Sequence, residues 1–172
     1  ILLGLVGSEM CIRDSAYMMS ESGDAHGIGG QVPQLPHPEQ NLSTYRALAA
    51  AVRNGTVRTA HDCSEGGVAV ALAEMCIGGR LGASVDIDGT GEGDVWGRLW
   101  GESLGRFVVA VSPENEAQFL ASMKGHPTTV LGAVSDSSFL EVSDGDDVLI
   151  QMDVETMAEA WKGTLDLTGG IA

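Results

Sequence analysis

A short polar segment between two apolar runs, Thr59 to Val68, constrains the fold of this chain more than any other feature. The residues before it, Val57 to His61, have the pattern of a short strand. The alanine-rich run after it, Gly66 to Ile77, is apolar on nearly every side, which is typical of a helix buried against a sheet. We therefore expect a strand, a tight glycine turn and a buried helix in direct succession.

The polar segment places a carboxylate, a hydroxyl and two glycines at the start of that helix. Asp62 and Ser64 project to the same side of an extended turn, where Asp62 can hold Mg²⁺ and Ser64 can reach a phosphate oxygen. Gly66 and Gly67 permit close approach of the backbone to a ligand, and the N–H groups of a helix N-terminus attract anions. The alternative is that Asp62 or Ser64 caps the helix, and spacing alone favours this cap.

The remaining segments alternate between helix and strand patterns. The apolar run Gly105 to Val111 is nearly continuous, which indicates a strand covered on both faces. Further strands are predicted at 81–87, 128–134, 139–142 and 148–152, and further helices at 41–54, 95–100, 113–124 and after Asp153. Ser143 to Asp147 has the composition of a hairpin turn. This order predicts an α/β or α+β domain with a mixed sheet of roughly four to six strands and helices mainly on one face.

Periodicity also predicts which sides of two helices face the core. In the helix at 41–54 the apolar positions recur on one side, which comprises Leu42, Tyr45, Leu48, Ala49 and Val52. In the final helix, which Asp153 is expected to cap, the inner face comprises Val154, Met157, Ala158 and Trp161. We expect both sets of side chains to be buried.

Composition and charge exclude several classes of protein. The formal net charge of −15 over 172 residues repels phosphate backbones, so we expect no nucleic-acid partner. No apolar run approaches the ~20 residues of a membrane span, so we expect no membrane association. Three cysteines without paired spacing, and no export signal, favour a reducing cytoplasm.

The first residues differ in character from the rest of the chain. Leu5 to Ser15 has neither strand alternation nor helical periodicity and is similar to translated adapter or vector sequence. We expect a non-native or disordered leader over residues 1–15, with a native strand and loop as the alternative, and a single domain over 16–172. Within that domain, residues 16–40 are rich in Gly, Ser, Pro and His and are predicted to be loop.

Several motifs together resemble one enzyme family. The run Ala60 to Met75 resembles the "AHD-x-S-[DE]-GGLAVALAEM" segment of phosphoribosylformylglycinamidine synthase, a purine-biosynthetic enzyme related to aminoimidazole ribonucleotide synthase. The likeness continues through Gly101 to Val109, Val130 to Val134 and the final helix from Asp153 to Trp161. It covers residues 16–167.

The resemblance implies a fold, an activity and a set of ligands. The chain is similar to the last C-terminal α/β domain of the synthetase. The implied activity is that of an ATP-dependent carbon–nitrogen ligase with glutamine as amido donor, which converts formylglycinamide ribonucleotide to formylglycinamidine ribonucleotide; we expect the isolated chain to lack it. The implied ligands are Mg²⁺ on Asp62 and the phosphates of ATP or ADP on Ser64, Gly66 and Gly67, at an auxiliary site without catalytic residues.

The resemblance also implies partners and leaves alternatives. The implied partners are the N-terminal domains of the same polypeptide, a glutaminase subunit or domain, and a small accessory subunit. One alternative is a non-catalytic packing domain of the same superfamily. Another is part of a related enzyme, namely aminoimidazole ribonucleotide synthase, selenophosphate synthetase or thiamine-phosphate kinase.

Overall fold

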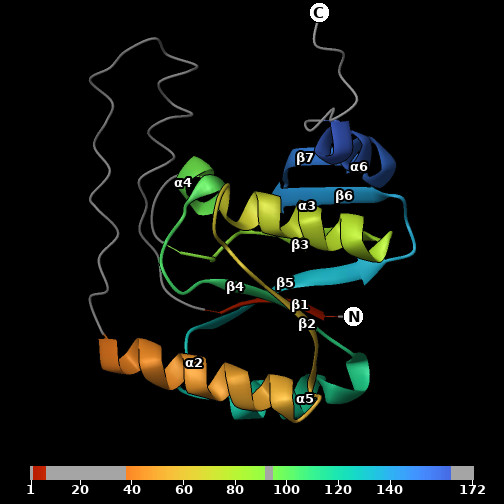
Figure 1. Ribbon diagram of the computed structural model, residues 1–172. Coiled ribbons are helices and arrows are strands. Elements are labelled where there is room, and N and C mark those ends of the chain that lie inside the picture. Colours follow the sequence, from red (N-terminus) through yellow and green to blue (C-terminus); the bar gives the residue numbers. More distant parts are fainter. Residues whose placement is uncertain (1, 7–37, 92–94, 164–172) are drawn as a thin grey trace, which may run out of the picture.

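The computed structural model describes residues 2–6, 38–91 and 95–163 (Figure 1). Within these ranges seven strands form one sheet. The strands are β1 (Leu2–Val6), β2 (Val57–Asp62), β3 (Gly82–Asp86), β4 (Phe107–Val111), β5 (Thr128–Ser135), β6 (Phe139–Asp144) and β7 (Asp147–Asp153). The helices are α2 (Pro38–Arg53), α3 (Gly67–Gly79), α4 (Val95–Trp100), α5 (Glu116–Ser122) and α6 (Val154–Gly163), and a short 3-10 helix, η2 (Pro113–Asn115), precedes α5.

The sheet is mixed and follows the order β2-β4-β1-β5-β3-β6-β7. β3 and β6 pair in parallel, whereas the other neighbouring strands pair antiparallel. β6 and β7 form the predicted hairpin around Gly145, whose φ of 60° suits a left-handed turn position. The predicted mixed α/β fold is thus confirmed, although the described sheet has seven strands rather than roughly four to six.

Strand β4 lies between two cores on opposite faces of the sheet. Val108 and Ala110 belong to the core under α3 and α6, whereas Val109 and Val111 belong to the core under α2 and α5. The three valines are 0% exposed, and burial of such a side chain contributes about 1.5–3 kcal/mol. The predicted two-sided strand is confirmed. Figure 1 shows α3 and α6 on one side of the sheet and α2 and α5 on the other. The prediction that the helices lie mainly on one face was therefore wrong.

Helix α2 is rotated relative to the face that periodicity predicted. Its buried residues are Asn41, Thr44, Leu48 and Ala51. Leu42 and Val52, both predicted to be inside, are each 47% exposed. The reason is a polar contact between α2 and the segment that joins α5 to β5, since Thr44 Oγ1 lies 3.1 Å from Nδ1 of His126. Of the predicted inner residues, Leu48 is the one that joins the core.

The final helix follows its prediction except at one residue. The backbone N–H of Thr156 donates to Asp153 Oδ1 at 3.0 Å, which confirms Asp153 as the cap of α6. Val154, Met157 and Ala158 are buried as expected. Trp161 is 60% exposed, so its predicted inner position was wrong. It lies in the last turn of the helix, where α6 ends beyond the core.

The start of the chain also differs from expectation. Residues 2–6 were expected to belong to a leader, but Leu2–Val6 forms β1, which pairs antiparallel with β4 on one side and β5 on the other. The reason is tertiary, because an apolar strand in mid-sheet is specified by its neighbours rather than by its own short pattern. Residues 7–37 lie outside the described residues, so the leader at 7–15 stays a prediction, as does most of the loop at 16–40. The last residues of that predicted loop, 38–40, are helical.

Candidate functional site

The predicted metal and phosphate ligands lie at the end of strand β2. Asp62 is the last residue of β2, opposite Phe107 of β4, and its side chain is 62% exposed. The hydroxyl of Ser64 donates a hydrogen bond to Asp62 Oδ2. This bond, followed by a backbone hydrogen bond of Asp62 itself, holds the pKa of the Asp62 carboxyl below its usual range. Asp62 therefore presents a negative charge to solvent at neutral pH.

The backbone donors at the start of helix α3 have partners within the chain. The N–H of Gly66 donates to Glu102 Oε1 at 2.9 Å, and the N–H of Gly67 donates to the carbonyl oxygen of Ser64 at 3.1 Å. The N-cap position is Gly66, so neither Asp62 nor Ser64 supplies the side-chain cap that the alternative interpretation required. A phosphate bound at these N–H groups would have to replace the Glu102 carboxylate.

Both glycines are required by geometry and not only by ligand approach. Gly66 has φ 76°, and an added Cβ would lie 2.3 Å from Cγ2 of Val70. Gly67 has φ 61°, and an added Cβ would lie 2.7 Å from the carbonyl oxygens of Leu99 and Gly101. The start of α3 therefore packs directly against the backbone at the end of α4.

A groove of about 1080 Å³ opens beside this pair. One wall is α2, which contributes Tyr45, Ala49 and Val52. The opposite wall is the loop that follows α4, with Leu104 at 52% exposure. Asp62, Ser64 and Glu102 lie at the polar end, and Arg106, which is 1% exposed, forms part of the lining. An apolar wall with a few convergent polar groups is the usual make-up of a small-molecule site.

Of these lining residues, sequence reasoning assigned Asp62 and Ser64 to the ligand site, and it considered Glu102 to Arg106 separately, as a polar loop around a substrate or a turn. Glu102 and Arg106 lie in the segment Gly101 to Val109 that carries the family resemblance, and that resemblance was the available signal. Tyr45 carried no signal, because its pattern predicted a buried position. In the structure its ring meets Phe107 edge-on, with centroids 5.9 Å apart and planes at 81°.

The neighbouring His61 and Cys63 have environments that fit a structural role rather than a catalytic one. His61 Nε2 lies 3.0 Å from Glu74 Oε2 of α3, and His61 Nδ1 lies 2.7 Å from the carbonyl oxygen of Asp62. Burial raises the pKa of the Cys63 thiol to about 11. A thiol at that pKa is neutral at physiological pH, so Cys63 is unsuited to be a nucleophile.

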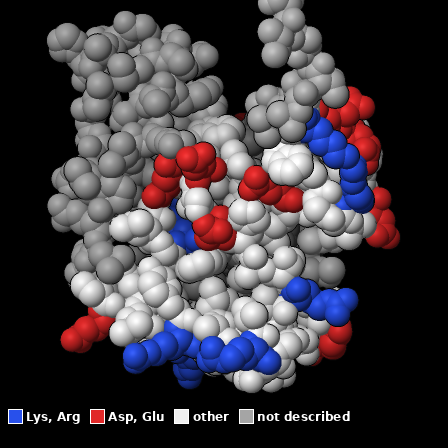
Figure 2. All heavy atoms as spheres, viewed as in Figure 1, with Lys and Arg blue, Asp and Glu red and all other residues white. Residues whose placement is uncertain are grey.

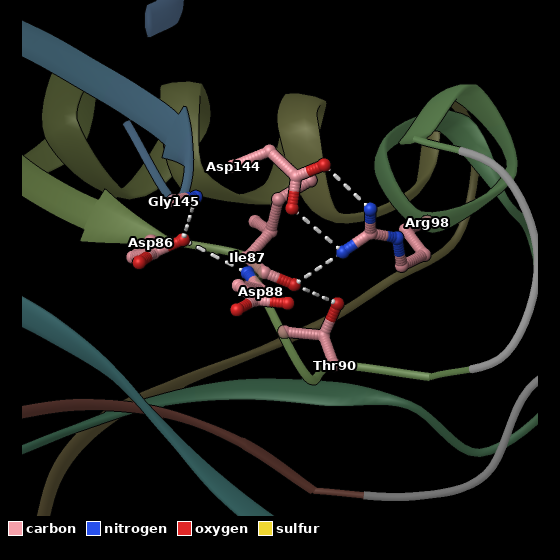
Figure 3. Close-up of polar contacts among 7 residues, drawn as sticks. All are labelled: Asp86, Ile87, Asp88, Thr90, Arg98, Asp144 and Gly145. Carbon is pink, nitrogen blue, oxygen red and sulfur yellow. Dashed lines mark hydrogen bonds and ion pairs between the residues drawn. The ribbon is translucent and has the colours of Figure 1, made fainter. Parts of the chain in front are cut away.

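Asp86, at the C-terminal end of β3, and Asp144 belong to a network of hydrogen bonds and an ion pair within the domain (Figure 3). Arg98 of α4 donates to both carboxylate oxygens of Asp144, at 2.9 and 2.6 Å, and to the carbonyl oxygen of Ile87 at 3.0 Å. Asp86 Oδ1 accepts from the N–H groups of Asp88 and Gly145, at 2.9 and 3.0 Å, and these two bonds lower its pKa. This network joins α4 to the β6–β7 hairpin.

The donor set for a metal ion is small. Among residues 2–6, 38–91 and 95–163, no three His, Cys, Asp or Glu side chains converge as a metal site. Mg²⁺ needs only one or two carboxylates when phosphate oxygens and water complete its six ligands. The ionised Asp62 at the groove fits such a role, with most ligands supplied from elsewhere. In the same part of the chain, no helix has the length and apolar character to cross a membrane.

Comparison with known proteins identifies the family. Residues 3–145 match the family described as "AIR synthase related protein, C-terminal domain". The phosphoribosylformylglycinamidine synthase subunit PurL of Synechocystis sp. is 33% identical over 143 residues, which make up 80% of this chain and 18% of that protein.

Solved structures agree with this match. T. maritima PurL complexed with FGAR has a TM-score of 0.72 and 25% identity, over 92% of this chain and 27% of that one. E. coli HypE, a hydrogenase maturation protein, shares the fold with a TM-score of 0.59 and 15% identity, over 89% of this chain and 49% of that one.

The chain spans about a fifth of the curated relative and about a quarter of T. maritima PurL. The resemblance inferred from the motifs around Asp62 and Glu102 is confirmed. The chain belongs to the AIR synthase related proteins, in which it corresponds to a PurL-like C-terminal domain.

Proposed function

We propose that this chain is the C-terminal domain of a phosphoribosylformylglycinamidine synthase and that its groove contributes an Mg²⁺–nucleotide contact. The whole enzyme would use ATP to amidate formylglycinamide ribonucleotide, as a carbon–nitrogen ligase supplied with nitrogen from glutamine. The observation that carries the proposal is the pair formed by Asp62 and Ser64, which is hydrogen-bonded, ionised and exposed at the polar end of the groove.

Each residue of the pair has a defined part in this proposal. Asp62 would hold Mg²⁺ through its carboxylate, and the ion when bound would offset the charge of the nucleotide phosphates. The Ser64 hydroxyl now donates to Asp62, and it can turn to donate to a phosphate oxygen when the metal takes over the carboxylate. Gly66 would offer its N–H only after Glu102 has moved, so Glu102 limits how closely a phosphate approaches α3.

The buried guanidinium of Arg106 supports the same end of the groove. Its charge lies close enough to act on the Cys63 thiol, whose pKa it lowers against the larger effect of burial. A positive charge near Cys63, which stands between Asp62 and Ser64 in the sequence, favours an anionic ligand at this end of the groove, on a chain whose net charge of −15 otherwise repels anions.

The whole-protein properties are part of the proposal. Since the chain spans 18% of the curated relative, the main ATP and substrate residues would lie in the N-terminal domains of a longer polypeptide. A glutaminase subunit or domain would supply ammonia, and a small accessory subunit would join the complex. We place the enzyme in the cytoplasm and expect no turnover from the isolated 172-residue chain.

Calorimetric titration with ATP and ADP, with and without Mg²⁺, tests the ligand site. We expect Mg²⁺-dependent binding that Asp62→Asn weakens by about tenfold or more, because one charged ligand of the metal is lost. Asp146→Asn, an equivalent change at an exposed acid of the β6–β7 hairpin, should leave binding unchanged. Equal affinity in wild type and Asp62→Asn, or no binding in either, would contradict the site.

A packing role is the second candidate, and one observation favours it. The Glu102 carboxylate already satisfies the N-terminus of α3, as a bound anion would. If this contact is permanent, the domain serves to support its neighbours in the longer protein. The titration above separates the two candidates, because a packing domain binds no nucleotide.

A further inference from the structure

Helix α2 carries a second apolar stripe beside its buried face. The stripe consists of Leu42, Tyr45, Ala49 and Val52, which recur at alternating spacings of three and four residues. Leu42 and Val52 are each 47% exposed, and Tyr45 and Ala49 are half-buried. Such spacing is the pattern of a helix–helix seam. We call these four residues the α2 seam.

The buried face of α2 lies next to the seam and is complete without it. Asn41, Thr44, Leu48 and Ala51 face the sheet and α5, displaced by one residue from the seam. Because this face and the contact of Tyr45 with Phe107 anchor α2, the two large aliphatic residues Leu42 and Val52 remain exposed at the ends of the seam. An apolar row along a helix that leaves two large side chains about half exposed is a candidate interaction surface.

Two arginines flank the seam on the same side. Arg46 follows Tyr45 and Arg53 follows Val52, so both occupy the same position of successive heptads, and both are exposed. Glu39 holds that position at the start of α2. Figure 2 shows Lys and Arg side chains along the edge of the molecule formed by α2. This local positive charge contrasts with the net charge of −15 of the whole chain.

We propose that the α2 seam docks an amphipathic α-helix of a partner protein or domain, with an apolar stripe of matching period and acidic residues beside it. The narrow stripe fits one helix rather than a broad sheet face, and Arg46 and Arg53 select carboxylates at the flanking positions of that helix. A second copy of α2 is a poor occupant, because antiparallel pairing brings Arg46 of both copies together near the middle of the seam.

The docked helix would also change the groove. Tyr45, Ala49 and Val52 line the groove that holds Asp62 and Ser64, so a helix on the seam covers the α2 wall of that groove and narrows the groove. The docking proposal does not depend on nucleotide binding, since it rests on the seam and its arginines alone.

Two designed helical peptides test the proposal with the full 172-residue chain. Both have leucine at the seam positions over about three heptads, one with glutamate and the other with lysine at the flanking positions. Fluorescence anisotropy should show the glutamate peptide binding about tenfold or more tightly than the lysine peptide. The double substitution Leu42→Gln with Val52→Gln should weaken binding of the glutamate peptide by a similar factor.

Two further variants make the result specific. Arg46→Glu with Arg53→Glu should reverse the preference, so that the lysine peptide binds more tightly. Val148→Gln with Met152→Gln removes apolar side chains that are 58% and 45% exposed on β7 and should leave binding unchanged. Circular dichroism confirms that each variant is folded. The proposal would be overturned if both peptides bound equally tightly, or if the substitutions at Leu42 and Val52 left binding unchanged.

Sedimentation of the peptide-free chain gives an independent outcome. A monomer is expected, in agreement with an acidic partner helix as occupant. A dimer that Leu42→Gln with Val52→Gln dissociates would show that a second copy occupies the seam, and it would overturn the proposal.

Discussion

The carboxylate of Glu102 accepts a hydrogen bond from the backbone N–H of Gly66 at 2.9 Å, across 36 positions of the sequence. The loop after α4 thereby supplies the negative charge at the N-terminus of α3. Charge and hydrogen bonding act together there, since the helix dipole favours an anion at that end.

Removing this carboxylate should weaken the junction between α3 and the loop. We expect Glu102→Ala to lower the free energy of unfolding by about 1–2 kcal/mol, because a charge-assisted hydrogen bond and a favourable dipole contact are lost together. Glu102→Gln, which keeps an acceptor oxygen, should lower the free energy of unfolding by less. Urea unfolding followed by circular dichroism measures both variants. A loss of the same size in both would show that packing, not the carboxylate, matters at this position.

Alanine substitutions at Gly67 and Gly55, which both have positive φ, distinguish the cost of a steric clash from the cost of backbone strain. Gly67→Ala should lower the free energy of unfolding by about 3 kcal/mol or more, since its Cβ would meet carbonyl oxygens at 2.7 Å in addition to the backbone cost. Gly55→Ala, with φ 71° and nothing within 4 Å, should lose only the backbone cost of about 1–2 kcal/mol. Thermal and urea unfolding of the pair check this order, and equal losses would contradict it.

The bond from Ser64 to Asp62 predicts a pH effect of known sign. The folded-state pKa of Asp62 lies below the ordinary value of 3.8, so the stabilisation is present above that value and disappears as the pH falls through the folded pKa. Ser64→Ala removes the largest cause and should move the pKa upward towards 3.8. Carboxyl ¹³C chemical shifts across a pH titration report this pKa directly. The pKa of Asp86, which hydrogen bonds from the N–H groups of Asp88 and Gly145 lower, should be the same in both proteins.

The ion pair of Arg98 and Asp144 should contribute much more than the exposed pair of Arg80 and Glu155. The side chains of the first pair are 11% and 25% exposed, and those of the second are 45% and 65% exposed. Asp144→Asn removes the carboxylate charge that Arg98 binds through two hydrogen bonds and should cost about 2 kcal/mol or more. Glu155→Gln should cost less than about 1 kcal/mol. Chemical unfolding of both variants decides this, and similar losses would contradict the difference in burial.

Local patterns predicted most elements because those elements bury a continuous or regularly spaced apolar surface. The continuous apolar run around Val108 predicted a strand covered on both sides, and the uniformly apolar helix beginning near Gly67 was placed correctly against the sheet. The hairpin at Gly145 followed from turn composition. In each case the residues that decide the structure lie close together in the sequence.

Other predictions failed where distant residues decide the outcome. The orientation of α2 depends on the contact from Thr44 to His126, 82 positions away, which periodicity alone does not contain. β1 depends on pairing with β4 and β5. At the candidate site, the motif pointed to Asp62 and Ser64 but not to the Glu102 carboxylate at the N-terminus of α3.

The sequence by itself determined the family, the mixed α/β architecture and the strand, glycine turn and helix that display Asp62 and Ser64. These depend on residue type and local spacing. Only the tertiary structure decided that Ser64 bonds to Asp62, that Glu102 rather than either residue satisfies the start of α3, and that Leu42 and Val52 of the α2 seam are exposed. Those outcomes depend on which distant segments meet, because hydrogen bonds and close packing form only between groups that the fold brings within a few ångströms.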